Sequence, residues 1–226
     1  MLGDALSYPR NNPDWIPTIL IGGVLSVLGV LILPIFIVQG YSVRVMRSAA
    51  KGETSAPSFT DWGGLTVDGL KLFVISIAYA LLIVIPIVAV TVVLGLGSTL
   101  ADPTTGPSAA FGVATLLGFL VIGLFGLAIG YFAPAGYANF AVEDSLGAAF
   151  DVSTIVSAAT TGEYFTAWVL AVLVGLVGGL LGGALSVVIV GIFVVFYVQI
   201  VVYYLFGRGF AKGLGKKRRA AAESNV

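Results

Sequence analysis

Long apolar runs separated by short polar segments dominate the pattern of the chain. The uninterrupted runs cover residues 16–43, 72–97, 109–140 and 164–206. About 20 apolar residues are enough for a helix to cross a bilayer, so each of the first three runs predicts one spanning helix. The last run has 43 residues without a charge, and as one helix it would be roughly 65 Å long, about twice the hydrocarbon thickness. It therefore predicts two helices, 164–181 and 185–206, with a turn at the glycines of 178–183.

This pattern predicts an all-α fold, a polytopic helical membrane protein with five transmembrane helices. We expect one membrane domain over residues 1–226, with interfacial or cytoplasmic loops at 44–71 and 141–163, a short turn at 98–108, and a basic tail at 207–226. In the loop 141–163, Val142, Leu146 and Phe150 recur every fourth residue, which predicts a short helix with one apolar face on the membrane surface.

Two of the apolar stretches resemble each other. The segment 22–39 (GGVLSVLGVLILPIFIVQ) and the segment 182–199 (GGALSVVIVGIFVVFYVQ) are identical at ten of eighteen positions without a gap. Both end on a glutamine and both precede a basic segment, so we expect two helices that run in the same direction. This is the pattern of a parallel internal repeat, although a chain so rich in glycine, valine, leucine and isoleucine can also produce such a match by chance.

The distribution of positive charge predicts the topology. Ten of the eleven lysines and arginines lie in the first loop and in the tail, and these residues concentrate on the cytoplasmic side of membrane proteins. With both segments inside, five helices place the N-terminus outside and the C-terminus in the cytoplasm of a multi-pass cell membrane protein. The third loop is acidic although this topology puts it inside; acidic residues contribute little to the rule.

Composition argues against several classes of function. Hydrophobic residues make up 58% of the chain and charged residues 10%, and cysteine and histidine are absent. Disulfides, thiolate nucleophiles, histidine or cysteine metal sites and a Ser-His-Asp triad are thereby excluded. No charged residue lies at the centre of a predicted span, which disfavours a proton relay or an ion-coupled pump. We expect no enzyme activity, no cofactor and no metal.

The candidate polar site within the membrane is the pair Gln39 and Gln199, which occupy matching places in the repeated stretches. An amide in hydrocarbon needs hydrogen-bond partners. The pair can line a path for a solute or a lipid headgroup, or it can hold two helices together, and the second reading is favoured.

Basic residues beside the predicted spans are candidates for contact with anionic lipid headgroups, which attract each nearby lysine or arginine by about 1 kcal/mol. A simple stop-transfer role explains the tail equally well, and nucleic acid is not an expected partner. The candidate lipid contacts are Arg44, Arg47, Lys51, Lys212, Lys216, Lys217, Arg218 and Arg219.

A run of motifs in the first loop resembles a known family. They are Pro34, Gly40-Tyr41, Arg44-Val45-Met46-Arg47, Gly52-Glu53, Pro57-x-Phe59-x-Asp61-Trp62 and Asp68-Gly69-Leu70-Lys71. Together with Pro134…Gly136-Tyr137 and Ala149-Phe150-Asp151, they are similar to an archaeal family of integral membrane proteins catalogued as domain of unknown function 4013. The resemblance covers nearly the whole chain. It implies an archaeal cell membrane protein and brings no activity and no functional residues.

Two functions therefore stay open. The first is a non-catalytic scaffold or accessory subunit, whose partners are membrane lipids and either other membrane subunits or further copies of itself, packed through glycine-rich helix faces. The alternative is a small transporter or channel with its polar site between the repeated helices.

Overall fold

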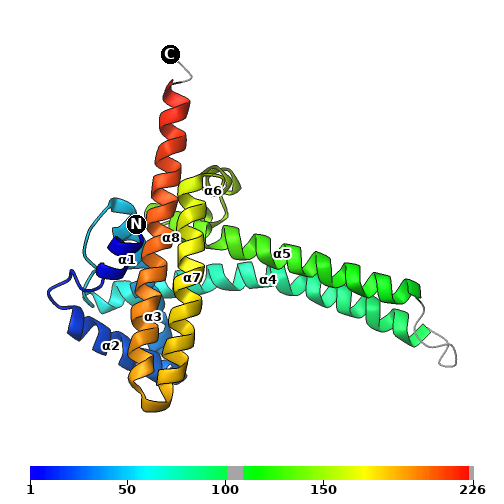
Figure 1. Cartoon of the computed structure of the whole chain (residues 1–226), viewed down its shortest axis with the longest axis horizontal. Helices are drawn as coiled ribbons and strands as arrows, with labels where there is room; N and C mark the ends of the chain where they lie inside the picture. The colour runs from blue at the N-terminus through cyan, green and yellow to red at the C-terminus, as the bar shows by residue number, and fades with distance from the viewer. Residues whose placement is uncertain (101–108, 224–226) are drawn as a thin grey trace. The chain divides into compact units, whose positions relative to one another are not determined.

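The computed structural model describes residues 1–100 and 109–223, and within these ranges every regular element is a helix. The chain divides into two compact units, which are treated separately: unit 1 holds Met1–Ile75 and Pro134–Val226, and unit 2 holds Ser76–Ala133. The elements in chain order (Figure 1) are α1 (Leu2–Ser7), α2 (Trp15–Val27), η1 (Leu28–Leu31), α3 (Leu33–Lys51), α4 (Trp62–Leu100), α5 (Ala109–Glu143), η2 (Leu146–Phe150), α6 (Val152–Ala159), α7 (Gly162–Leu185), η3 (Ser186–Val188) and α8 (Val190–Glu223).

Four of the described helices are long and apolar enough to cross a membrane: α4, α5, α7 and α8. A further apolar helical segment, Trp15–Leu31, is shorter. The predicted class, a polytopic helical membrane protein, is confirmed. Helix α4 reaches Leu100, and the rest of the turn predicted at 98–108 lies outside the described residues.

The first apolar run is not the single tilted helix that we expected at 16–43. Helix α2 ends at Val27, and η1 together with Ile32, whose φ is +67°, reverses the chain into α3. Pro34 lies in the first turn of α3, where its missing amide costs nothing, and does not kink a continuous helix. The 13 residues of α2 are roughly 20 Å long, which is short of the 30 Å hydrocarbon core. The run therefore forms a helical hairpin.

The last apolar run forms two helices as predicted, but the turn lies at 186–189 and not at the glycine cluster. The glycines stay inside α7 and allow α8 to approach. A Cβ atom on Gly178 would lie 2.3 Å from a methyl group of Val198, and one on Gly182 would lie 2.6 Å from a methyl group of Val195. Small residues at helix crossings serve this purpose in membranes, where close packing replaces the hydrophobic effect.

The repeated stretches share local structure as well as sequence. Each contains the end of one helix, a short 3₁₀ segment and the start of the next helix. In each, a serine hydroxyl donates to the carbonyl four residues earlier, Ser26 to Gly22 and Ser186 to Gly182, both at 2.7 Å. The expected helix–helix similarity is therefore a similarity between two helix–turn–helix corners.

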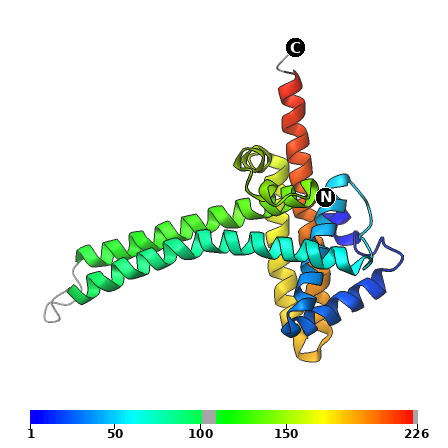
Figure 2. The same ribbon diagram turned by 180° about the vertical axis from the view of Figure 1, so that it is seen from behind.

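Helices α3 and α8 lie side by side and run in the same direction (Figures 1 and 2). The rings of Tyr41 and Phe196 are 5.6 Å apart, and further along both helices Met46 backbone atoms lie within 3 Å of the position where Gly207 would carry a Cβ. This agrees with the direction predicted for the two glutamine-containing stretches.

The segment before α2 packs against the first loop of unit 1. The Ala56 amide donates to the Tyr8 carbonyl at 3.1 Å, and the Asn11 side chain donates to the Thr54 carbonyl at 2.8 Å. The Tyr8 ring also lies 4.4 Å from that of Tyr204 on α8. We expected the N-terminus and this loop on opposite sides of the membrane, whereas the structure brings these two segments into contact.

The polar loops are shorter than predicted because helices extend into them. Helix α3 continues through Lys51 and ends at Gly52, whose φ of +89° makes it a left-handed C-terminal cap. Between α5 and α7, the chain forms η2 and α6 and not one amphipathic helix through Val142, Leu146 and Phe150.

Helix α6 is capped at its N-terminus by Asp151. The Asp151 carboxylate accepts from the Thr154 hydroxyl at 2.7 Å and from the Thr154 amide at 3.2 Å. These hydrogen bonds to the charged form, the hydroxyl bond first, hold the pKa of Asp151 below its usual value. The cap is therefore strongest when the carboxylate is ionised.

Unit 2 consists of the paired, antiparallel portions of α4 and α5 between Ser76 and Ala133 (Figure 2). A Cβ on Gly118 would lie 2.8 Å from a methyl group of Val90, so this glycine faces α4. Most other large side chains of the unit are exposed, among them Leu116 at 71%.

Candidate functional site

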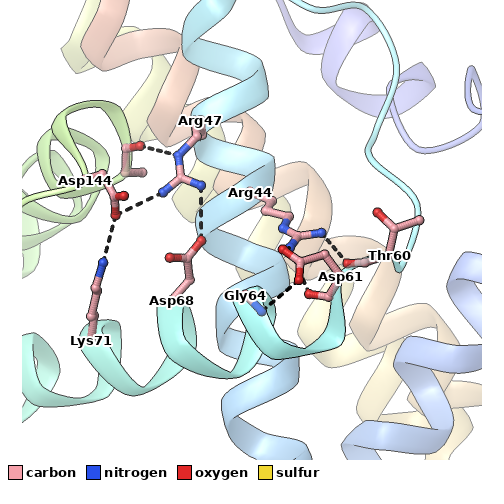
Figure 3. A network of polar contacts seen from close by, with 9 residues as sticks. Arg44, Arg47, Thr60, Asp61, Gly64, Asp68, Lys71 and Asp144 are labelled. Atoms are coloured by element: carbon pink, nitrogen blue, oxygen red, sulfur yellow. Dashed lines mark hydrogen bonds and ion pairs between the residues drawn. The ribbon is translucent and has the colours of Figure 1, made fainter.

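An ion-pair network centred on Arg47 joins three helices on the loop side of unit 1 (Figure 3). Arg47 Nε donates to the Ala141 carbonyl at 2.7 Å, and Nη1 donates to Asp68 Oδ2 at 3.1 Å. Asp144 Oδ1 lies 3.6 Å from Arg47 Nη2 and accepts from Lys71 Nζ at 3.0 Å. The planar guanidinium of Arg47 carries several donors in fixed directions, which suits simultaneous contact from α3 to α4 and to the end of α5.

A second arginine on α3 holds the start of α4. Arg44 Nη2 donates to the Asp61 carboxylate and to the Asp61 carbonyl, each at 3.0 Å, and Nη1 donates to the Thr60 carbonyl. The other oxygen of Asp61 accepts from the Gly64 amide at 3.1 Å in the first turn of α4 (Figure 3). Arg44 and Arg47, which we predicted as lipid contacts, are therefore engaged by carboxylates and carbonyls of the protein.

Closer to the N-terminus of α3 than these arginines, α3 and α4 cross at two glycines. A Cβ on Gly40 would lie 1.8 Å from the Leu65 carbonyl oxygen, and a Cβ on Gly69 would lie 1.7 Å from the Phe36 carbonyl oxygen. Only glycine permits backbones to come so close. This crossing sets the distance across which Arg47 reaches Asp68.

The two glutamines do not form a symmetric pair. Gln199 Nε2 donates to Ser42 Oγ at 2.9 Å, which ties α8 to α3, and the Ser42 hydroxyl donates in turn to the Val38 carbonyl at 3.1 Å. Gln39 Oε1 is buried, and no hydrogen-bond partner for it is found among the described residues. Neither glutamine lines any of the cavities described below.

The remaining predicted lipid contacts gather around the C-terminal half of α8. Lys212, Lys216 and Arg219 line a cavity of about 620 Å³, and Lys51 and Arg218 line a cavity of about 210 Å³ with Arg47. Lys216 Nζ donates to Glu163 Oε1 at 2.8 Å. Lys217 is exposed and lines neither cavity.

Sequence reasoning missed Arg208, which lines the larger cavity with Lys212 and Lys216. The signal was present in the chain, because positions 208, 212 and 216 are four residues apart and share one face of a helix. It also missed the acidic partners of Arg44 and Arg47, since the chain segments involved become neighbours only through helix packing. Among the described residues, no three acidic side chains are grouped closely enough to hold a metal ion.

The long apolar helices and the short polar connections between them define a polytopic integral membrane protein. The sequence model of a family described as "Protein of unknown function (DUF4013)" matches residues 24–187, well over half of the chain. The chain belongs to this family, which confirms the resemblance of its motifs. Comparison with curated proteins and with solved structures yields no match.

Proposed function

We propose that this protein is a non-catalytic integral membrane protein that serves as a scaffold or accessory subunit of a membrane assembly. The observation that carries the proposal is the surface of unit 2. Leu116, Phe119 and Leu127 of α5 are 65–71% exposed, and among the described residues of unit 2 only α4 packs beside this part of α5. Lipid can solvate such a surface, but the side chains of a second membrane protein can fill it with closer packing than lipid chains do.

The same helix offers close approach to a partner. A Cβ placed on Gly123 or on Gly126 would meet no atom within 4 Å, whereas one on Gly118 would contact α4. Glycines that face outward from a spanning helix allow another backbone to approach, and close packing is the main source of helix association in lipid. This supports α5 as the helix that receives a partner.

Photo-cross-linking tests the proposal in native membranes. The chain has no cysteine, so a Leu116→Cys variant carries one benzophenone-maleimide label at a unique site. The matched control is Leu180→Cys on α7, where the side chain is 75% exposed. We expect a heavier protein adduct from position 116 and not from 180. Native mass spectrometry after mild extraction that finds only the monomer, with adducts at neither position, would refute the role.

We further propose a cell membrane topology with four crossings, α4, α5, α7 and α8, and with both chain ends in the cytoplasm. The contact between residues 8–12 and 54–58 supports one side for the N-terminal segment and the first loop. All eleven lysines and arginines then face the cytoplasm, including Arg10, whereas the five-helix arrangement left Arg10 outside. The α2–α3 hairpin enters and leaves the membrane on that same side.

Single-cysteine accessibility tests this topology. Cysteines at Ser7, at Ser55 and at Ala222 should react with a membrane-impermeant maleimide only after the cells are opened. A cysteine at Thr104, in the connection between α4 and α5, should react in intact cells. Labelling of position 7 in intact cells, with position 55 protected, would restore the arrangement with five crossings.

A small transporter or channel is the second candidate, on the one observation that Gln39 Oε1 is buried without a described partner. Such an atom can receive a hydrogen bond from a passing polar solute. Glycerol flux into proteoliposomes measures this, with Gln39→Leu as the test variant and Gln199→Leu, which removes an engaged amide, as the comparison. Flux equal to that of protein-free liposomes would exclude a path for small polar solutes of this size.

A further inference from the structure

A cationic cleft lies along α8 where this helix leaves the apolar region. The cleft has a volume of about 620 Å³, and four basic side chains line it: Arg208, Lys212, Lys216 and Arg219. Glu163 neutralises Lys216 at 2.8 Å, and Glu223 is the other acid in the lining. Within residues 1–223 as described, the other three cations form no ion pair. The cleft therefore keeps an excess of positive charge for an anion of the size of a phosphate ester.

A small polar cavity continues from this cleft along α7. Its volume is about 270 Å³, and its lining includes Glu163 and Lys212, which also line the cleft, together with Gly162 and Thr166. Gly162 is the first residue of α7, so the positive end of the helix dipole adds to the field at this point. The two shared residues make the cleft and the cavity neighbours.

An apolar groove of about 330 Å³ follows on the same face of α7. It is lined by α1 and α7, together with Val198 of α8; the lining residues of α1 and α7 are Leu2, Leu6, Leu170, Leu173, Val174, Val177 and Gly178. Positions 163, 166, 170, 173 and 177 are three or four apart, which places them on one face of a helix. The polar cavity and the apolar groove therefore succeed one another along α7, from its first turn toward its centre.

The apolar groove fits within one leaflet. Leu170 and Gly178, which mark the ends of the groove on α7, are eight residues apart and so about 12 Å apart along the helix axis, less than the roughly 15 Å of half the 30 Å hydrocarbon thickness. Positive charge lies at the end where α8 becomes basic, and apolar side chains occupy the rest. A free phosphate would leave the groove empty, and a purely apolar molecule would leave the cations unpaired.

We propose that this track is a specific binding site for one anionic phospholipid, with its phosphate held by Arg208 and Lys212, with Arg219 adding positive charge further along the cleft, and with one acyl chain lying between α1 and α7. The site differs from ordinary lipid contact because α1 walls one side of the groove. It requires neither the partner at α5 nor any solute path, so its test is independent of the proposed scaffold role.

Native mass spectrometry of the full chain in detergent, with added phosphatidylglycerol or phosphatidylcholine, tests the headgroup contacts. We expect one phosphatidylglycerol to be retained at least tenfold more strongly than phosphatidylcholine. Lys212→Ala combined with Arg219→Ala should reduce that retention about tenfold. Lys217→Ala combined with Arg218→Ala removes the same charge from positions outside the large cleft and should change retention less than twofold.

A second pair of variants tests the acyl groove. Val174→Trp fills the groove and should displace the bound lipid, whereas Leu176→Trp, at an outward position that does not line it, should not. Circular dichroism and gel filtration establish that both variants remain folded. Equal retention of the two lipids, or equal loss with both basic double variants, would show only non-specific lipid contact and overturn the proposal. Competition by millimolar inorganic phosphate without any effect of Val174→Trp would mark an anion site and overturn the assignment to a lipid.

Discussion

The crossing of α3 and α4 at glycine gives the sharpest test of the fold. In Gly40→Ala, the added Cβ would lie 1.8 Å from the Leu65 carbonyl oxygen and 3.0 Å from the Gly69 nitrogen, whereas ordinary contacts begin at 3.4 Å. The obstacle is backbone, so no change of rotamer relieves it. The two helices must separate by roughly 1.6 Å, the difference between 3.4 and 1.8 Å.

The expected cost follows from overpacking. Forcing extra volume into a close-packed contact typically costs about 1–3 kcal/mol, and the separation also lengthens the Arg47–Asp68 contact of 3.1 Å. Replacing glycine by alanine in a helix returns about 0.5–1 kcal/mol. We expect a net loss of about 2 kcal/mol in the free energy of unfolding, which is roughly a thirtyfold change in the ratio of folded to unfolded protein.

Thermal unfolding of the purified full chain in detergent, followed by tryptophan fluorescence, measures this. On the scale of about 2–4 °C per kcal/mol for a chain of this size, Gly40→Ala should lower the Tm by about 4–8 °C. Gly179→Ala is the matched control, because a Cβ there meets no atom within 4 Å, and it should leave the Tm unchanged or raise it slightly. If Gly40→Ala proves as stable as Gly179→Ala, α3 and α4 do not cross at this glycine and the reasoning is wrong.

Three further predictions concern polar contacts. Arg47→Ala should lower the free energy of unfolding by about 2–3 kcal/mol in thermal unfolding, because it leaves the carboxylate of Asp68, a residue that is only 9% exposed, without its partner. Arg44→Ala should cost under about 1 kcal/mol, because its partner carboxylate is 71% exposed. Equal losses in the two variants would contradict this. Gln199→Leu should lower the free energy of unfolding by about 0.6–2 kcal/mol. In a double-mutant cycle with Ser42→Ala, the two losses of free energy should not add, because the two side chains share one hydrogen bond. Asp151→Ala should lower the hydrogen-exchange protection of α6 severalfold, because the first turn loses its cap. In the wild type, the protection that the cap gives should be full above the pKa of the unfolded carboxyl and should be lost as the pH falls through the lower pKa of the folded state. Asp151→Asn should keep a cap whose protection does not depend on pH. Wild-type protection without pH dependence would refute the role of the ionised carboxylate.

The sequence contained enough information for the class of protein and for most helices. Apolar length alone predicts α4, α5 and the α7–α8 pair, because a chain in lipid must satisfy its backbone hydrogen bonds within helices. The motifs of the first loop predicted the family correctly. The 43-residue run also had to be two helices on length alone, and it is.

The turns could not be read from the sequence. Glycines at 178–183 suggested a turn, yet they serve the α7–α8 contact, and the reversal occurs at Ile189, whose φ is +65°. The first run likewise reverses at Ile32. A β-branched residue at positive φ gives no turn signal, and only the packing of α2 on α8, where a Cβ on Gly22 would lie 2.1 Å from the Phe196 ring, favours a hairpin over one long helix.

The sequence by itself determined that this chain is helical and lipid-solvated and that its charges lie at few places, because hydrophobic length and charge count are properties of the chain alone. Only the tertiary structure decided which charges meet. Arg47 finds Asp68 and Asp144, at separations of 21 and 97 residues, because the Gly40–Gly69 crossing brings α3 and α4 into backbone contact. The same packing returns the N-terminal segment to the first loop and walls the groove on α7 with α1. Contacts between distant segments depend on shape at each helix crossing, and that shape is not periodic in the sequence.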